Sequence, residues 1–600
     1  KYNDDSGVAN AAYIINSTTV NEFNFAVHHD AQYAVPNSQS EIDKLSRSKI
    51  GMTLSQFYPQ LNPINMIPWA SFGGITGAAS FVTDSRFPMR SADTVFDLSD
   101  NLSKVWGVHT LKAGIYYERV RYFSSGNGTN FGSFDFSSDT NNPVNTGYAY
   151  SNALMGVFRS YQESNSRVET NGRGNTLEWF VQDSWRASRK LTLDYGLRFT
   201  WYTPYTDARS QAASFLPNLF DASKAPRLYY PVLNASGQRV AYDRVTNTYA
   251  PAVLIGAIVP NSGNTANGMV LDDGKTIDRG LMKHQGVMYG PRFGFAYDVF
   301  GNGKTAVRGG FGVMYNTRER VLLLDVARTP PVQYTPTIYY GTFATLLQSA
   351  GTLFPVSTAG LSVAGNVPSV YNYSLGIQRN VGFNTVVDVA YVGALGRHLL
   401  DLRNIATLPY GFRFLASNQD STTGRPLPDN YLVPYRGFSS VTIDEFASSS
   451  NYHSMQVQVN RRFSRGLQFG GTWTWSKSMD FASNDWGSVA QIVPVRIWNY
   501  GKSDFDRTHI VQINALWDLP KATKLVNNKV LGVIADNWQL SGIASFVSGG
   551  PSGISLSTTT GLDIPGGGDG VRPIVLSNPI LPKSQRSLLG YFRNLSLIHI

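Results

Sequence analysis

The sequence predicts an all-β protein, an antiparallel β-barrel that crosses a membrane. Three observations lead to this prediction. Apolar and polar residues alternate along many segments, which is the period of a strand with one apolar face. Short turns join these segments into hairpins, whereas long irregular connections join one hairpin to the next. Aromatic residues reach 13% and charged residues only 15%, against about 25% charged residues in a typical soluble protein.

The hairpin at residues 455–478 illustrates the alternation. Val457 and Trp473 belong to its apolar set of alternate residues, and Gln456 and Thr472 belong to its polar set. The turn is FSRG, residues 463–466. Similar patterns give about fourteen strands, most of about 10–13 residues. In chain order the others are a lone strand at 18–29 and hairpins at 94–120, 177–202, 291–315, 371–393 and 509–549.

In a half-buried sheet of a soluble sandwich, apolar and polar residues also alternate. The lengths of the strands and of the connections therefore have to distinguish a soluble sheet from a transmembrane barrel. Soluble strands usually have about 5–6 residues, whereas about 9–11 cross a tilted bilayer. Long loops at one end and tight turns at the other are typical of transmembrane barrels. A soluble β-propeller would repeat every 40 residues or so, and these hairpins are unevenly spaced. The long links are residues 203–289, 316–369, 394–452 and 479–507.

The two faces of the predicted barrel carry different residues. Because charges at mid-strand suit a wet lumen better than a dry core, we expect the charged alternate residues to face the lumen. These are Lys112, Glu118, Asp194, Arg198, Arg292, Asp298, Arg308 and Asp388. Tryptophans near strand ends are expected to form the girdle at the lipid interface. These are Trp179, Trp185, Trp201, Trp475, Trp517 and Trp538.

Composition excludes several other classes of protein. The chain has no cysteine, which excludes disulfides, thiolate catalysis and Cys-ligated zinc. The net charge is +10, but Lys and Arg are scattered singly, so we expect no nucleic-acid partner. The longest apolar run, near residues 252–259, is far shorter than a membrane helix. We predict no cofactor, no metal site and no enzymatic activity.

Four short motifs could carry chemistry, and each has a simpler interpretation. Residues 299–305 resemble the end of a phosphate-binding loop, but Asp298 stands where that motif needs glycine. His28 and His29 lack a third ligand at useful spacing. The segments 271–276 and 566–570 could bind Ca²⁺ weakly. A hairpin turn, a solvated strand end and exposed turns are the favoured interpretations.

Aromatic residues in the long loops are candidates for contacts with a solute. Rings suit stacking on sugars or flat chelates. The alternative is that they pack the loops together. The candidates are Trp69, Tyr229, Tyr230, Tyr339, Tyr340, Trp486 and Trp498.

Six segments resemble TonB-dependent outer-membrane receptors, in the order found in that family. They are residues 179–199, 289–315, 371–400, 451–478, 503–520 and 537–551. The most similar group is the Oar-like subfamily, whose members carry an N-terminal carboxypeptidase-regulatory-like domain. The resemblance implies a 22-stranded barrel in the outer membrane of a Gram-negative bacterium, with an N-terminal plug inside it. Implied partners are outer-membrane lipid, an extracellular solute, the barrel assembly machinery and, through an N-terminal segment, the TonB–ExbB–ExbD complex.

Measured against that family, residues 1–594 are expected to form part of the barrel. The plug, the TonB box, the regulatory-like domain and some strands are expected to lie outside these residues. Residues 595–600, LSLIHI, resemble the translated end of a sequencing adapter and are expected to be non-native.

Three functions follow from this fold. The first is energy-coupled uptake of large scarce solutes, such as oligosaccharides or siderophore-like chelates. The second is a surface barrel for adhesion or envelope organisation without transport. The third is a passive porin, which would typically have fewer strands. A plug separates the first from the third, and substitutions of lumen charges separate the first from the second.

Overall fold

A computed structural model describes residues 2–79, 81–83, 87–125, 128–316, 322–484, 486–492, 494–524 and 529–553, with 564, 566, 572, 578, 580–587 and 590. The predicted adapter tail at 595–600 and most of the segment 566–570 lie outside the described residues. No helix in the described part of the chain is long and apolar enough to cross a membrane.

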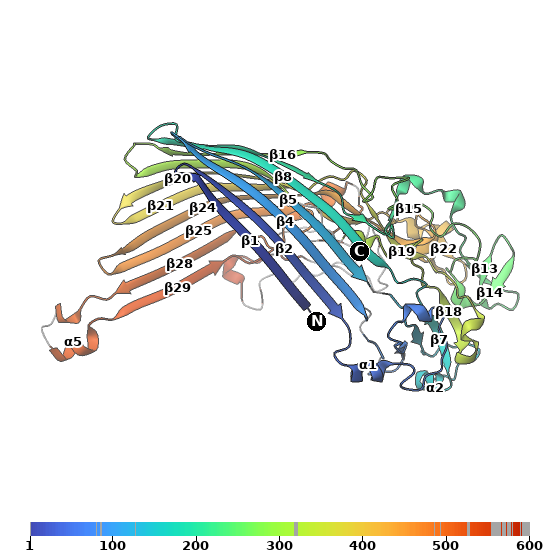
Figure 1. Ribbon diagram of the computed structural model, residues 1–600. Coiled ribbons are helices and arrows are strands. Elements are labelled where there is room, and N and C mark those ends of the chain that lie inside the picture. Colours follow the sequence, from blue (N-terminus) through green and yellow to red (C-terminus); the bar gives the residue numbers. More distant parts are fainter. Residues whose placement is uncertain are drawn as a thin grey trace.

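One large sheet dominates the structure (Figure 1). Within the described residues, fourteen of its strands run in succession, each antiparallel to the next. They are β1 (Tyr2–Asn16), β2 (Thr19–Ala34), β4 (Met89–Trp106), β5 (His109–Ser125), β8 (Glu169–Trp185), β9 (Leu191–Tyr202), β16 (Met288–Asp298), β17 (Thr305–Tyr315), β20 (Ser369–Gly382), β21 (Thr385–Asn404), β24 (Phe438–Ser464), β25 (Leu467–Asp480), β28 (His509–Asp518) and β29 (Gln539–Val547). The predicted hairpins are confirmed.

The described residues form an open sheet rather than a closed barrel. β1 pairs only with β2, and β29 pairs only with β28, so the sheet is open at these two edges within the described part of the chain. The all-β antiparallel prediction is confirmed, whereas closure and a total of 22 strands are not. The reason is that closure needs a ladder between the two edge strands, and no such ladder is present in the described residues.

Two details of the strand prediction were wrong. The segment at 18–29 is no lone strand, because β2 pairs with β1 on one side and with β4 on the other. β1 escaped notice because its first half, YNDDSG, lacks apolar alternation. Most strands are also longer than expected, up to 27 residues in β24. Their ladders continue past the apolar stretch, toward the long loops.

The connections are strongly asymmetric. Most short turns have two to six residues, and they all lie at one end of the sheet in Figure 1. The turn between β28 and β29 is the exception and holds η9 (Ala522–Lys524) and α5 (Lys529–Ala535). All the long connections lie at the other end, where they fold into a layer with its own small sheets. We call this the loop layer, and it consists of the described residues within 35–88, 126–168, 203–287, 316–368, 405–437 and 481–508.

The loop layer contains short elements. Its strands, with those joining the main sheet, are β3 (Trp69–Ser71), β6 (Ser133–Asp135), β7 (Val157–Gln162), β10 (Thr206–Asp207), β11 (Ala213–Phe215), β12 (Tyr230–Leu233), β13 (Arg239–Asp243), β14 (Thr248–Ala250), β15 (Met269–Leu271), β18 (Thr337–Thr342), β19 (Val356–Leu361), β22 (Gln419–Asp420), β23 (Arg425–Pro426), β26 (Ser488–Val489) and β27 (Gly501–Lys502). Its α-helices are α1 (Gln39–Leu45), α2 (Ala149–Leu154), α3 (Leu322–Asp325) and α4 (Val495–Asn499). The 3-10 helices of this layer are η1 (Pro59–Leu61), η2 (Pro217–Leu219), η3 (Ala222–Lys224), η4 (Ala252–Leu254), η5 (Phe343–Gln348), η6 (Phe412–Phe414), η7 (Ala416–Asn418) and η8 (Asp429–Tyr431), and η10 (Lys583–Gln585) follows β29.

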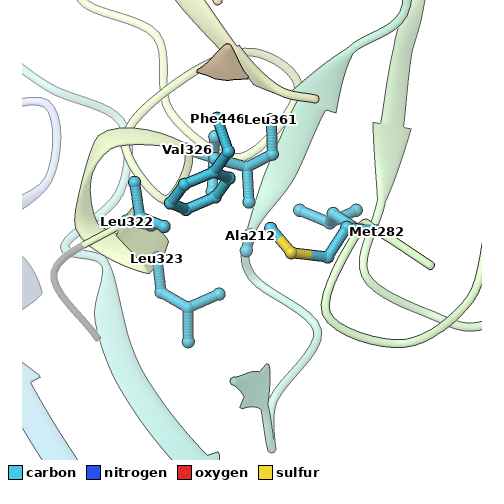
Figure 2. Close-up of a cluster of buried hydrophobic side chains, with 8 residues drawn as sticks. Ala212, Met282, Leu322, Leu323, Val326, Leu361 and Phe446 are labelled. Carbon is cyan, nitrogen blue, oxygen red and sulfur yellow. The ribbon is translucent and has the colours of Figure 1, made fainter. Parts of the chain in front are cut away.

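The hydrophobic core of this protein sits mainly in the loop layer. Among the described residues there are four clusters of buried apolar side chains, two of them within the layer and two between it and β24. Figure 2 shows the cluster that joins two long connections to Phe446 of β24. Its members are Ala212, Leu281, Met282, Leu322, Leu323, Val326, Leu361 and Phe446. The layer is therefore a packed unit anchored on the sheet.

Replacing a core aromatic in this layer tests that conclusion. Phe158 of β7 is fully buried, with its ring centroid 5.3 Å from that of Phe134. We expect Phe158→Ala to destabilise the loop layer by about 3–5 kcal/mol, because it removes buried surface and leaves a cavity. The measurement is the thermal midpoint of the near-ultraviolet circular dichroism. Phe383→Ala, in an exposed short turn, is the control, and an equal effect of both changes would contradict a core in the loops.

Candidate functional site

The register of the sheet places all eight predicted lumen residues on one face. Lys112 stands opposite Gln182, Gln182 opposite Gly196, and Gly196 opposite Arg292. The same rung continues through Gly312 of β17, Asn372 of β20 and Ala394 of β21. Residues directly opposite share a face, and so do alternate residues along a strand. The face that holds this rung, which we call the polar face, therefore also holds Glu118, Asp194, Arg198, Asp298, Arg308 and Asp388. That it lines a lumen stays a prediction.

Five of the six predicted girdle tryptophans lie on the opposite face, which we call the outward face, and Trp538 lies one residue before β29, two residues from Leu540 of that face. The five share this face with Val457 and Trp473. Trp185, Trp517 and Trp538 lie at the short-turn end, and the other three lie six to eight residues further along their strands. That offset is roughly 20–26 Å of strand, which suits the two interfaces of an outer-membrane barrel. Their role at a lipid interface stays a prediction.

Two of the predicted charges on the polar face are held by neighbours. Arg198 donates from Nε to Glu178 Oε2 at 2.8 Å, and Thr200 donates to the other oxygen of Glu178 at 3.0 Å. Glu118 accepts from Thr176 and from Tyr116, each at 3.2 Å. Glu178 was missed by the sequence analysis. The available signal was its position, four residues before Gln182 on the same face of β8.

A shallow hollow lies beside this network. It has a volume of about 120 Å³ and is lined by Phe180, Gln182, Gly196, Arg198 and Arg292, among others. Glycines surround Arg292 on the polar face: Gly196 and Gly312 lie directly opposite it, and Gly290 and Gly294 lie two residues away along β16. The wall here offers guanidinium groups and open backbone, which suits hydrogen bonding to polar solutes.

The predicted loop aromatics are used largely in packing the loop layer. Trp69 donates to Thr83 at 3.1 Å and meets the ring of Phe131 edge-on. Tyr340 donates to Asp139 at 3.0 Å, and Tyr339 lies edge-on to Phe354. These contacts favour the packing alternative for these three rings.

Three of the remaining four candidates also have packing partners. The Arg244 guanidinium lies 3.6 Å from the centre of the Tyr230 ring, which also packs against Tyr431. Trp486 packs against the cluster of Figure 2, and Arg572 lies over the ring of Trp498. Tyr229 is half-buried. The rings of Tyr339 and Tyr340 lie edge-on to each other, but the structure does not gather the seven candidates into one site.

Other loop aromatics are more accessible and were missed. Tyr410 is 82% exposed and Tyr249 is 61% exposed. Tyr148, before α2, is also exposed and has the ring of Tyr150 beside it. Periodicity gave no signal for them, because loops have none. They are the better candidates for a surface that meets a solute.

Buried ion pairs hold the loop layer together. Arg227 donates to Asp243 through Nε at 3.1 Å and Nη2 at 2.8 Å. These bonds hold the pKa of Asp243 far below its ordinary value. Glu163 is buried and accepts from the backbone amides of Phe57 and Tyr58 and from the hydroxyl of Tyr161. These residues serve the fold of the layer rather than a reaction.

One buried carboxyl has a different environment. Asp444 lies in the part of β24 that extends into the loop layer, two residues before Phe446 and 2% exposed. Its Oδ2 atom has no hydrogen-bond partner within the described residues. Burial, with the nearby carboxyl of Asp325, raises the pKa of Asp444 to about 8. The folded loop layer therefore holds Asp444 as a neutral acid at neutral pH.

The chain is similar to one known protein family and to several solved structures. The model of a family described as "Outer membrane beta barrel domain" matches residues 1–595. No curated protein matches the sequence. Among solved structures, the chain is similar to the outer membrane transporter YddB from Escherichia coli, with 10% identity and a TM-score of 0.44 over 86% of this chain and 48% of that one.

Two further solved structures have similar values. The FrpB iron transporter from Neisseria meningitidis is 10% identical, with a TM-score of 0.36, over 86% of this chain and 49% of that one. The ferric-catecholate import receptor Fiu from Escherichia coli K12 is 10% identical, with a TM-score of 0.35, over 86% of this chain and 52% of that one. The chain thus spans about half the length of these structures.

The raised pKa of Asp444 predicts how the loop layer responds to pH. Between an unfolded pKa near 4 and the folded value of about 8, the folded state holds a proton that the unfolded state releases. Stability therefore falls as pH rises through this window, by about 1.4 kcal/mol per unit. We expect the thermal midpoint to be lower at pH 8 than at pH 5, and Asp444→Asn to reduce that difference.

Two comparisons make this measurement specific. Burial raises the pKa of Asp401, also in the loop-side part of its strand, to about 7, so the variant should keep part of the pH dependence. Asp504→Asn, at an exposed carboxyl, should leave the wild-type dependence unchanged. A loop layer that becomes more stable from pH 5 to pH 8 would show that Asp444 is ionised in the folded state.

Proposed function

Because this chain belongs to the family of outer membrane β-barrel domains, we propose that it is barrel sequence of a TonB-dependent receptor that imports large, scarce solutes. The protein is located in the outer membrane of a Gram-negative bacterium. The solute class we propose is an oligosaccharide or a siderophore-like chelate. Energy would come from a TonB–ExbB–ExbD complex, acting through a part of the receptor N-terminal to the barrel.

One observation carries this proposal. All the long connections lie at the same end of the sheet and form a folded layer, while the polar face below them presents a row of charged and amide side chains. A bare pore would need neither a structured layer nor so much folded sequence at its entrance. A receptor needs both, a surface that selects a solute and a wall along which it passes.

The six segments that resemble the Oar-like subfamily support a narrower assignment. They fall on strands β8–β9, β16–β17, β20–β21, β24–β25, β28 and β29 with the turns between them, which is the part of the chain that lipid constrains most. We propose membership of that subfamily on this ground. Insertion through the barrel assembly machinery belongs to the same proposal.

A second function is favoured by a specific observation. The candidate aromatics in the loops are largely used in packing contacts, and the four apolar clusters give the layer a fixed shape. A rigid surface of this kind also suits adhesion or envelope organisation without transport. Uptake measurements separate the two functions, because adhesion does not need the polar face.

Neutralising charges on the polar face provides that test. In cells that express the full-length gene, we expect Arg198→Ala and Arg308→Ala to lower initial uptake of the solute by about tenfold, because a charged wall concentrates and guides polar solutes. Arg119→Ala, on the outward face of β5, is the matched control and should retain uptake. Initial rates with a radiolabelled oligosaccharide or ferric chelate provide the measurement.

The same cells distinguish the alternatives. Uptake in the parent strain that disappears in a strain without TonB supports the importer. Uptake that does not depend on TonB contradicts energy coupling and favours a porin. Cell-surface binding that persists with no uptake in either strain favours adhesion.

A further inference from the structure

The connection between β28 and β29 differs from every other short turn in the described residues. It runs from residue 519 to residue 538, whereas the others have two to six residues. It contains η9 and the helix α5. Figure 1 shows α5 projecting beyond the sheet at the short-turn end, on the side away from the loop layer. The connection therefore takes no part in the loop layer.

Helix α5 exposes large apolar side chains. Val533 is 88% exposed, Val530 is 70% exposed and Ile534 is 66% exposed. A helix of seven residues is too short to be stable by propensity alone. Exposed apolar side chains clustered on such a helix indicate a surface that is covered in the working protein.

Two hydrogen bonds place α5 at the end of the outward face. The amide of Leu519 donates to the carbonyl of Trp538 at 2.8 Å, and the indole of Trp538 donates to the carbonyl of Ile534 in α5 at 2.6 Å. Trp538 is two residues before Leu540, which stands opposite Trp517 on the outward face. Helix α5 thus lies next to the short-turn end of the outward face, which we expect to meet lipid.

Basic side chains lie around this helix. Lys521 and Lys524 are exposed within the same connection. Arg462, near the end of β24, and Arg465, in the neighbouring turn, are also exposed. Gly466 of that turn accepts a backbone hydrogen bond from Asp518. The acidic residues here are engaged: Asp518 accepts from Gln539 at 2.8 Å, and Asp536 accepts from the amide of Thr523 at 3.1 Å. The accessible charge is therefore mostly positive.

We propose that α5 and its flanks bind the surface of an anionic phospholipid bilayer at the short-turn end of the sheet. Val530, Val533 and Ile534 enter the boundary between headgroups and acyl chains, and the lysines meet phosphate groups. Interfacial helices combine these features, an apolar side, basic residues and a tryptophan. A protein partner at α5 would not explain why the apolar side chains of this helix lie next to the strands that we expect to face lipid. The function goes beyond solute uptake, since it anchors the barrel in one leaflet.

The absence of cysteine from the chain allows a direct test. The full chain is prepared with Val533→Cys or, as a matched control, Val245→Cys, which is 65% exposed between β13 and β14 in the loop layer. Each carries one polarity-sensitive fluorophore after labelling and is reconstituted into vesicles of phosphatidylcholine with phosphatidylglycerol. We expect the label at 533 to be quenched about fivefold less by aqueous iodide than the label at 245, and to be quenched by brominated lipid.

A second variant tests the charge. Lys521→Gln with Lys524→Gln should reduce the protection at 533 to the level seen in phosphatidylcholine alone. Equal protection in neutral and anionic vesicles would overturn the preference for anionic lipid. If the label at 533 stays as accessible to iodide as the label at 245, the proposal is wrong. The apolar side chains of α5 would then be expected to bind a soluble partner. These measurements do not involve uptake, so their outcome is independent of the proposed transport function.

Discussion

The antiparallel hydrogen-bond ladder is the constraint on which the rest of this structure depends. In a bilayer a backbone amide has no water to bond, so each strand must pair along its length. The ladder also fixes the register, and a slip of one residue would move every side chain to the other face. The rung from Lys112 to Arg292 shows the consequence, because charged and small residues from four strands meet on the same face. Segregated faces in turn allow one sheet to meet both lipid and water.

The same constraint explains how much could be predicted from the sequence. Hairpins were predictable because a strand and its partner are neighbours in the chain and share a period of two. Met455 pairs with Trp475 and Val457 with Trp473, so the residues that the alternation assigns to one apolar face do share a face. The exact register depends on a shift between Arg461 and Ser464, next to the turn, which the alternation does not predict. β1 was not predictable by this reasoning, since a strand rich in Asp, Asn and Ala carries little periodic signal.

The loop layer could not be predicted, for a different physical reason. Its contacts join residues far apart in the chain, such as Arg239 with Asp420 and Gln56 with Glu163. No periodic pattern in the sequence predicts such pairs. In loops rich in Gly, Pro and Ser, the apolar residues that pack together also follow no regular spacing. The sequence analysis found the loop aromatics but could not decide whether they contact a solute or pack the loops, and many of them pack the layer. Glu178 was missed because it belongs to a network that only the register reveals.

A single sheet with one apolar face and one polar face has no second layer along most of its length, and so has little room for a hydrophobic core of its own. The apolar side chains of the loop layer supply that core, which is why large residues there are buried while Trp475 and Ile543 of the sheet are exposed. A layer built this way keeps its shape without a ligand, so recognition falls to the side chains it leaves outside. Tyr249 and Tyr410 meet that description, and Trp69 and Tyr340 do not. Aromatic residues of the loops therefore divide into those that build the loop layer and those that it leaves accessible, and only three-dimensional packing separates the two.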